Sequence, residues 1–145
     1  MAETTSTAGG KTFHLEVVSP EGVLFDLPAR SIVAPGADGM LGVLVGHAPL
    51  VTPLVPDVLK IVGGDGKEIA LAIGSGFLQV ADDQVRVLVD SAERADEIDV
   101  ERAEEARRRA EERLKRRGAT DIDFVRAEVA LRRAIARLKV AGRTG

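Results

Sequence analysis

The chain changes character near residue 90, and this change constrains its fold more than any other feature of the 145 residues. All six prolines and twelve of the fifteen glycines lie before residue 91. The first 90 residues carry 5 basic and 11 acidic side chains, whereas residues 91–145 carry 15 basic and 12 acidic ones. Because proline and glycine interrupt helices and mark turns, we predict two parts with different structures and different roles.

The first part has the pattern of many short β-strands separated by turns. The segment GGDG contains an Asp-Gly hairpin signal, and the pair Asp82-Asp83 separates two apolar runs by two residues. Strands are predicted at 13–18, 23–27, 30–35, 57–62, 67–73, 77–81 and 84–89, with Pro28 as a stop. Such spacing favours an antiparallel β-sandwich or flattened barrel of about ten short strands.

From Ala92 onward the apolar residues recur every three or four positions, which predicts two helices. The face of the first helix comprises Val100, Ala103, Ala106, Ala110 and Leu114. The face of the second comprises Phe124, Ala127, Leu131, Ala134, Ile135 and Leu138. Gly118 and Thr120 or Asp121 are expected to cap the break between them, giving an antiparallel two-helix hairpin. An alanine seam buries little area at about 25 cal/mol per Å², so the hairpin should be able to separate.

The expected organisation is a disordered tail at 1–11, a β-sandwich at 12–90 and a helical hairpin at 91–145. No long apolar run is present, so no transmembrane helix is expected, and the polar N-terminus lacks the apolar core of a signal peptide. There is no cysteine. A cytosolic compartment is therefore favoured.

The sequence lacks the residues that several classes of protein need for their function. The glycine-rich segments GADGMLGVLVGHAP and GGDGK lack the Lys-Ser/Thr of a phosphate-binding loop and are predicted to be turns. His14 and His47 have no spacing for a metal site, and no catalytic grouping is evident. A net charge of −3, no Trp, no Tyr and four Phe do not favour nucleic-acid binding.

The segment IDVERA, residues 98–103, contains one residue that helix capping does not explain. Asp99 is a good N-cap residue, but Arg102 then falls at the third helical position, where a cation opposes the helix dipole. One explanation is an ion pair of Arg102 with Asp99 or Glu93. The other is an anionic ligand, bound with help from the free N–H groups of the helix start.

Arg126, Arg133 and Arg137 lie seven and four residues apart, so they share a face of the second helix. Folding the hairpin back brings Arg133 and Arg137 towards Arg102. Converging arginines suit a polyphosphate, and they equally suit an acidic protein surface or a solvated face.

Nearly the whole chain, from about Phe13 to Ala141, resembles the epsilon subunits of bacterial F-type ATP synthases. The matching segments of the first part are LEVVSPEGVLFD, GADGMLGVLVGHAPLVTPL and GSGFLQV. Those of the second part are AERADEIDVERAEEARRRAEERL and DIDFVRAEVALRRAIARLKV. The chain departs from the family at Val45, where proline is frequent, and in the charged link RRGAT.

The resemblance implies a non-catalytic rotor subunit of the proton-translocating enzyme, peripheral to the cytoplasmic face of the bacterial membrane. The sandwich would bind the gamma subunit and sit on the ring of c subunits. The loop expected to face the ring comprises Asp38, Gly39, Met40, Leu41 and Gly42. The hairpin would act as a brake that extends into the catalytic alpha/beta hexamer, where its basic residues meet an acidic segment of the beta subunit and inhibit ATP hydrolysis.

Some family members bind ATP in the folded hairpin through a motif that Ile98, Asp99, Arg102 and Ala103 match. The supporting residues implied by the resemblance are Glu93, Arg109, Arg133 and Arg137. ATP would be a regulatory ligand, with no cofactor required. A free-standing ATP-sensing module is the alternative function, and an enzyme is a third.

Overall fold

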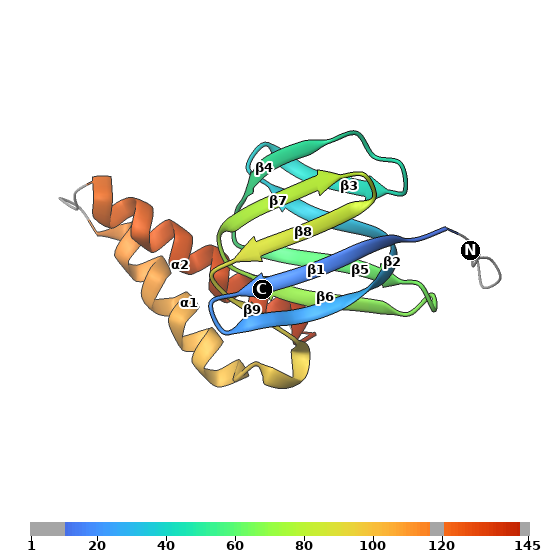
Figure 1. The fold of residues 1–145 in the computed structure, drawn as a ribbon. Coiled ribbons are helices and arrows are strands. Elements are labelled where there is room, and N and C mark those ends of the chain that lie inside the picture. The colour runs from blue at the N-terminus through green and yellow to red at the C-terminus, as the bar shows by residue number, and fades with distance from the viewer. Residues whose placement is uncertain (1–10, 117–120, 143–145) are drawn as a thin grey trace.

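The computed structural model describes residues 11–116 and 121–142, which form a β-sandwich followed by two helices (Figure 1). Most of the predicted tail and the predicted caps at Gly118 and Thr120 lie outside these residues, as does the side chain of Asp121. The described residues form nine strands. Their bounds are β1 Phe13–Ser19, β2 Gly22–Gly36, β3 Gly39–Leu44, β4 Leu50–Leu54, β5 Asp57–Gly63, β6 Glu68–Ile73, β7 Gly76–Ala81, β8 Gln84–Val89 and β9 Ala92–Glu93.

The strands pair in the order β1-β8-β7-β4-β2-β5-β6-β9, and β3 pairs with β2. The pairs are antiparallel except that β1 and β8, which are distant in sequence, run parallel. The turns predicted at GGDG and Asp82-Asp83 join β5 to β6 and β7 to β8. Asp82 and Asp83 both have positive φ, 52° and 57°, as a tight hairpin turn requires.

Two expectations about the first part are wrong. Pro28 does not end a strand, because β2 continues through it and changes partner, from β1 to β5 and β3. The register of β2 against β5 shifts between Ala29 and Ser31, and proline is tolerated beside such an irregularity. The segment GADGMLG is not all turn, since Gly39–Leu44 forms β3 and satisfies its backbone groups against β2.

Alternation along the strands builds one apolar core between the two layers of the sandwich. Val85, Val87 and Val89 of β8 are buried as predicted, while Arg86 on the opposite side is exposed. Leu15 of β1 and its neighbours on β2, β5 and β7 complete this core. The sandwich therefore has its own core, built without the helices.

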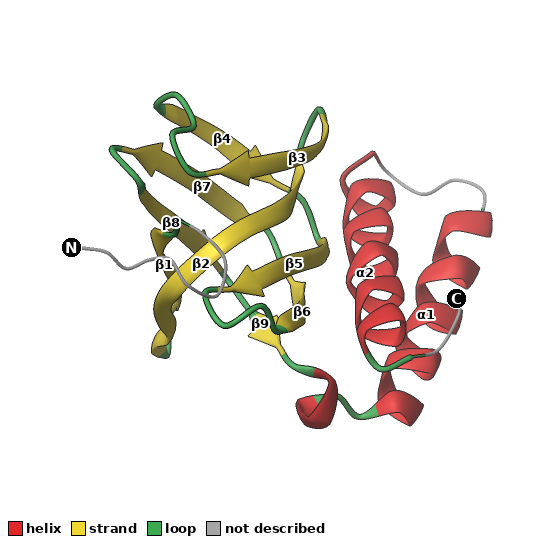
Figure 2. Ribbon diagram, turned by 90° about the vertical axis from the view of Figure 1, so that its right-hand side faces the viewer, coloured by secondary structure: helices red, strands yellow, loops and turns green. Residues whose placement is uncertain are grey.

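After β9 and a 3-10 turn, η1 Ala95–Glu97, come the helices α1 Val100–Lys115 and α2 Asp121–Val140. They form an antiparallel hairpin in which α2 lies between α1 and the sandwich (Figure 2). α2 contacts β5 and β6. The strand β9 lies after Asp90 and pairs with β6, so the sheet continues beyond the expected end of the sandwich at residue 90.

The seam between the helices is built mainly from alanine, as predicted, and Leu138 of the predicted face is also buried. Ala103 and Ala110 of α1 are buried, as are Ala127 and Ala134 of α2. Phe124 was expected on this face, but its side chain is 47% exposed. The last turn of α1 carries Leu114 as its only apolar residue, so little apolar surface is available there to cover Phe124.

Candidate functional site

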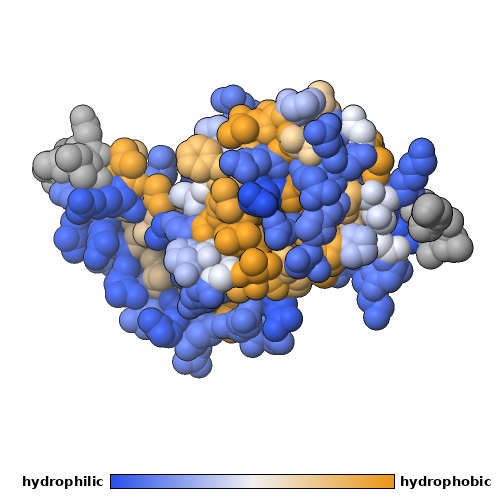
Figure 3. Space-filling model, in the orientation of Figure 1, coloured by the Kyte–Doolittle hydropathy of each residue, from blue (hydrophilic) through white to orange (hydrophobic). Residues whose placement is uncertain are grey.

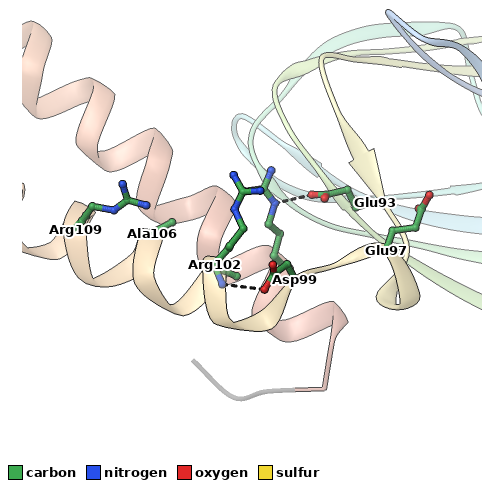
Figure 4. Close-up of a pocket in the computed structure, with 8 residues that line it drawn as sticks. Glu93, Glu97, Asp99, Arg102, Ala106 and Arg109 are labelled. Atoms are coloured by element: carbon green, nitrogen blue, oxygen red, sulfur yellow. Dashed lines mark hydrogen bonds and ion pairs between the residues drawn. The ribbon is translucent and has the colours of Figure 1, made fainter.

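A pocket of about 280 Å³ lies where the start of α1 meets β9, η1 and α2 (Figure 4). This volume is just below the range of about 300–1,000 Å³ that is usual for small-molecule sites. The residues that line it are Glu93, Glu97, Asp99, Arg102, Ala103, Ala106, Arg109 and Arg137.

Asp99 fixes the geometry at the start of α1. Its backbone is extended, and its carboxylate accepts a hydrogen bond from the backbone N–H of Arg102 at 3.1 Å. The predicted N-cap is thereby confirmed, and α1 begins at Val100. This start places Arg102 at the third helical position with its side chain in the pocket.

The carboxylates around the pocket already have donors. Glu93 accepts a hydrogen bond from Nε of Arg137 at 2.5 Å, which ties α2 to β9. Glu97 accepts one from the backbone N–H of Arg94 at 2.9 Å. Asp99 is the helix cap. None of the three is paired with the guanidinium of Arg102.

Within the part of the chain that the structure describes, the guanidinium groups of Arg102 and Arg109 have no hydrogen-bond or ion-pair partner. Both side chains leave α1 beside the pocket in Figure 4. The ion pair of Arg102 with Asp99 or Glu93, one of the two explanations raised by the sequence, is not formed. The other explanation, an anionic ligand, remains.

Six of the eight residues predicted for a nucleotide site lie together around this pocket, and two lie elsewhere. Ile98 packs against a small apolar cluster between the sandwich and α2. Arg133 donates a hydrogen bond to Asp90 at 2.9 Å and does not line the pocket. Arg133 and Arg137 are one helical turn apart, and both form ion pairs with carboxylates at the end of the sandwich, Asp90 and Glu93 respectively.

The sequence prediction missed Glu97 and Ala106 as lining residues. Ala106 lies three positions after Ala103 and three before Arg109, so helical spacing alone places it on the same face. Glu97 could not be found from spacing, because it reaches the pocket through the 3-10 turn η1, whose direction depends on tertiary packing.

The described lining residues supply carboxylates, guanidinium groups and methyl groups, with no hydroxyl, thiol or imidazole. The carboxylates, which are the groups here that could act as a nucleophile or base, each already accept a hydrogen bond: Glu93 from Arg137, Glu97 from the backbone N–H of Arg94 and Asp99 from the backbone N–H of Arg102. Two guanidinium groups that have no partner among the described residues, beside the N–H groups of a helix start, are suited to binding an anion such as phosphate.

The second predicted site, the loop from Asp38 to Gly42, lies at the end of the sandwich. Asp38 is in the turn between β2 and β3, and the rest of the loop is the beginning of β3. Met40 is 55% exposed there. Figure 3 shows apolar surface over the sandwich, in contrast with the mostly hydrophilic surface along α1. Other large apolar side chains exposed on the sandwich are Val23, Leu24, Val33, Leu44, Val51 and Phe77.

No helix among residues 11–116 and 121–142 is long and apolar enough to cross a membrane. The same residues contain no group of three or more His, Cys, Asp or Glu side chains that could hold a metal ion.

Comparison with known families gives two matches that together span residues 12–142. Residues 12–95 match the model described as ATP synthase, Delta/Epsilon chain, beta-sandwich domain. Residues 96–142 match the model described as ATP synthase, Delta/Epsilon chain, long alpha-helix domain. The junction between the two matches falls in η1, beside the pocket.

Curated relatives carry the same description. The ATP synthase epsilon chain of Desulforamulus reducens is 50% identical over 109 residues, which are 75% of this chain and 82% of that one. The ATP synthase epsilon chain of Moorella thermoacetica is 50% identical over 106 residues, covering 73% and 79%.

Solved structures share the fold. A chain of the Euglena gracilis mitochondrial ATP synthase, from a structure of OSCP/F1/c-ring, superposes with a TM-score of 0.77 at 24% identity, over 99% of this chain and 90% of that one. A chain of the Tetrahymena thermophila mitochondrial ATP synthase central stalk and c-ring superposes with a TM-score of 0.59 at 14% identity, over 88% and 95%.

Proposed function

Because this chain belongs to the family of ATP synthase delta/epsilon chains, we propose that it is a rotor subunit of the central stalk whose helical hairpin regulates ATP hydrolysis. It is an epsilon-type chain, a non-catalytic subunit of the synthase. Its sandwich would couple rotation of the c-ring to the gamma subunit at the cytoplasmic face of the bacterial membrane. The solved relatives come from structures that include the c-ring or central stalk, which supports this placement.

The sandwich offers surfaces for two partners. We assign the loop from Asp38 to Gly42, in which Met40 is 55% exposed, to the c-ring. Apolar side chains at Val51 of β4 and Phe77 of β7 are more than half exposed, which suits a permanent partner such as the gamma subunit.

The hairpin is suited to a regulatory role because little apolar surface holds it in place. Its inner seam is mainly alanine, with Leu138 as a buried larger side chain, and its apolar contact with the sandwich is centred on three buried residues, Val58, Ala72 and Ala136. A movable element needs a small free-energy difference between its states. Extended into the alpha/beta hexamer, the basic hairpin would meet an acidic segment of the beta subunit and inhibit hydrolysis.

The observation that carries a role for ATP is the guanidinium group of Arg102, which has no partner in the described part of the chain. Arg102, Arg109 and the helix start would hold the phosphates, with Asp99 and Ala103 nearer the base. Since the ligand would contact residues of both α1 and β9, bound ATP would favour the folded hairpin. ATP is then a regulatory ligand and not a substrate.

The test is reconstitution of an alpha/beta/gamma complex that lacks this subunit. The full chain should bind the complex and lower its rate of ATP hydrolysis. A chain that ends after Arg94 keeps β9 and the sandwich core, so it should bind equally well without inhibiting. Loss of gamma binding in the shortened chain would contradict this division of roles.

A free-standing ATP-sensing module is the second candidate, and the pocket at the start of α1 is what favours it. Purification from cells under native conditions separates the two. A rotor subunit should be recovered with a gamma subunit, whereas a free sensor should be recovered without one.

A further inference from the structure

In the ion pairs between α2 and the sandwich, every cation lies on α2 and every anion lies on the sandwich. α2 contributes Arg133, Arg137 and Lys139, which are all cations. The sandwich end contributes Asp90, Glu93 and Asp57, which are all anions. Among the described residues, these three ion pairs are the ones that join α2 to the sandwich segments.

The distances differ along the helix. Arg137 Nε lies 2.5 Å from Glu93, Arg133 lies 2.9 Å from Asp90, and Lys139 Nζ lies 3.9 Å from Asp57. The six side chains are between 31% and 54% exposed, so salt in the solvent can screen each pair. One such pair contributes little stability, but three of the same polarity act together on one helix.

The apolar contact beneath these pairs is small. It consists of Val58 and Ala72 of the sheet and Ala136 of α2, with Ile98 and Val140 packed against them at partial burial. Two of the three buried members are alanines, which remove little apolar area from water. The ion pairs are therefore a large share of what holds the helix to the sandwich.

Asp90 is also held in position by its surroundings. A Cβ added at Gly74 would lie 1.8 Å from the Asp90 carboxylate oxygen and 2.8 Å from the Ser91 hydroxyl. Only glycine leaves room for the carboxylate at this place, from which it accepts the hydrogen bond of Arg133. The backbone N–H of Asp90 donates to the carbonyl of Ser75 at 3.0 Å, which fixes the backbone there as well.

We propose that the pairs Arg133–Asp90, Arg137–Glu93 and Lys139–Asp57 form an ionic latch that sets how much of the protein has its hairpin docked on the sandwich. This inference rests on the proposed function in assuming that the hairpin moves. It adds that ionic strength controls the release, and that the three cations of α2 are available to an acidic partner only after they leave the sandwich.

The docked state can be followed by energy transfer between two dyes. The chain has no cysteine, so Thr12→Cys just before β1, an exposed neutral position away from Val51 and Phe77, and Val125→Cys on α2 give unique neutral attachment points. NaCl is raised from about 0.01 M to about 1 M, over which the Debye length falls from about 30 Å to about 3 Å. The ratio of molecules with an undocked hairpin to those with a docked one should rise about tenfold, because salt weakens three ion pairs that each have the strength of an ordinary surface pair.

Three variants in the labelled chain separate the latch from general charge effects. Arg133→Gln should raise the undocked fraction at low salt and flatten its salt dependence. Arg132→Gln is the matched control, since Arg132 is the exposed neighbouring cation outside the latch. Gly74→Ala keeps every charge but displaces the Asp90 carboxylate, so it should act like Arg133→Gln. Arg133 and Asp90 do not line the pocket, so these variants leave the lining residues of the candidate site in place.

The outcomes are distinct. A hairpin that undocks equally at all salt concentrations, or an effect of Arg132→Gln as large as that of Arg133→Gln, would overturn the latch and leave the proposed function standing. A hairpin that stays docked in every variant, at every salt concentration and in the reconstituted complex would overturn the movable brake and the latch with it.

Discussion

Arg102 places a positive charge at the third position of α1, where the helix dipole disfavours a cation by about 0.3–1 kcal/mol. Its backbone N–H is used by the cap Asp99, and its side chain is left without a partner among the described residues. The sequence was sufficient to identify this residue as unusual. It could not decide between an ion pair and a ligand, because that depends on Glu93 being taken by Arg137 of a distant helix.

His14 gives a pH-dependent prediction that concerns the sandwich alone. The carboxylate of Asp26, 2.5 Å from its Nε2, and the Gln84 amide raise its pKa above the ordinary 6.5. A histidine with a raised pKa in the folded state adds stability that is complete below pH 6.5 and is lost as the pH rises through the folded pKa.

The measurement is urea unfolding of the wild type and of His14→Gln across this range. The stability advantage of the wild type should shrink as the pH rises above 6.5. A difference that stays constant or grows with pH would show that the Asp26 contact does not favour the charged imidazole.

At the scale of elements, most strands and both helices followed from hydrophobic period and turn residues, whereas β3, β4 and β9 were not predicted. The full length of β2 was not predicted either, because Pro28 is a local signal for a strand end. Its pairing with β1 and then with β3 and β5 depends on tertiary structure. The prediction that Phe124 lies in the seam is wrong for a similar reason. Helical period places it on the seam, but burial also needs a partner residue at the same height of the other helix.

The alanine seam predicts that the hairpin opens before the sandwich unfolds. Small side chains bury little area, so α1 should detach in a local opening event of lower free energy. In native-state hydrogen exchange, amides of α1 should open at least about 2 kcal/mol more easily than those of β1 and β8, which is about thirtyfold in exchange rate. Equal protection in α1 and in these strands would mean that the hairpin is an integral part of one cooperative unit.

At the scale of the whole molecule, the change in composition near residue 90 correctly indicated a β part followed by a helical part. How α2 docks could not be predicted. Helical spacing put Arg133 and Arg137 on one face, but only the folded arrangement assigns Arg133 to Asp90 and leaves Arg137 beside the pocket. Contacts between segments more than 40 residues apart are decided by packing, which periodicity does not report.

We propose that the folded hairpin carries a nucleotide pocket in which Arg102 binds a phosphate, and calorimetric titration of the full chain with ATP tests this most directly. The wild type should bind saturably. Arg102→Ala should bind at least about tenfold more weakly, since a hydrogen bond to a charged group contributes about 1.5–3 kcal/mol. Arg108→Ala, an exposed cation of α1 outside the pocket, should bind like the wild type. No binding by the wild type up to millimolar ATP, or equal affinity in Arg102→Ala, would contradict the claim.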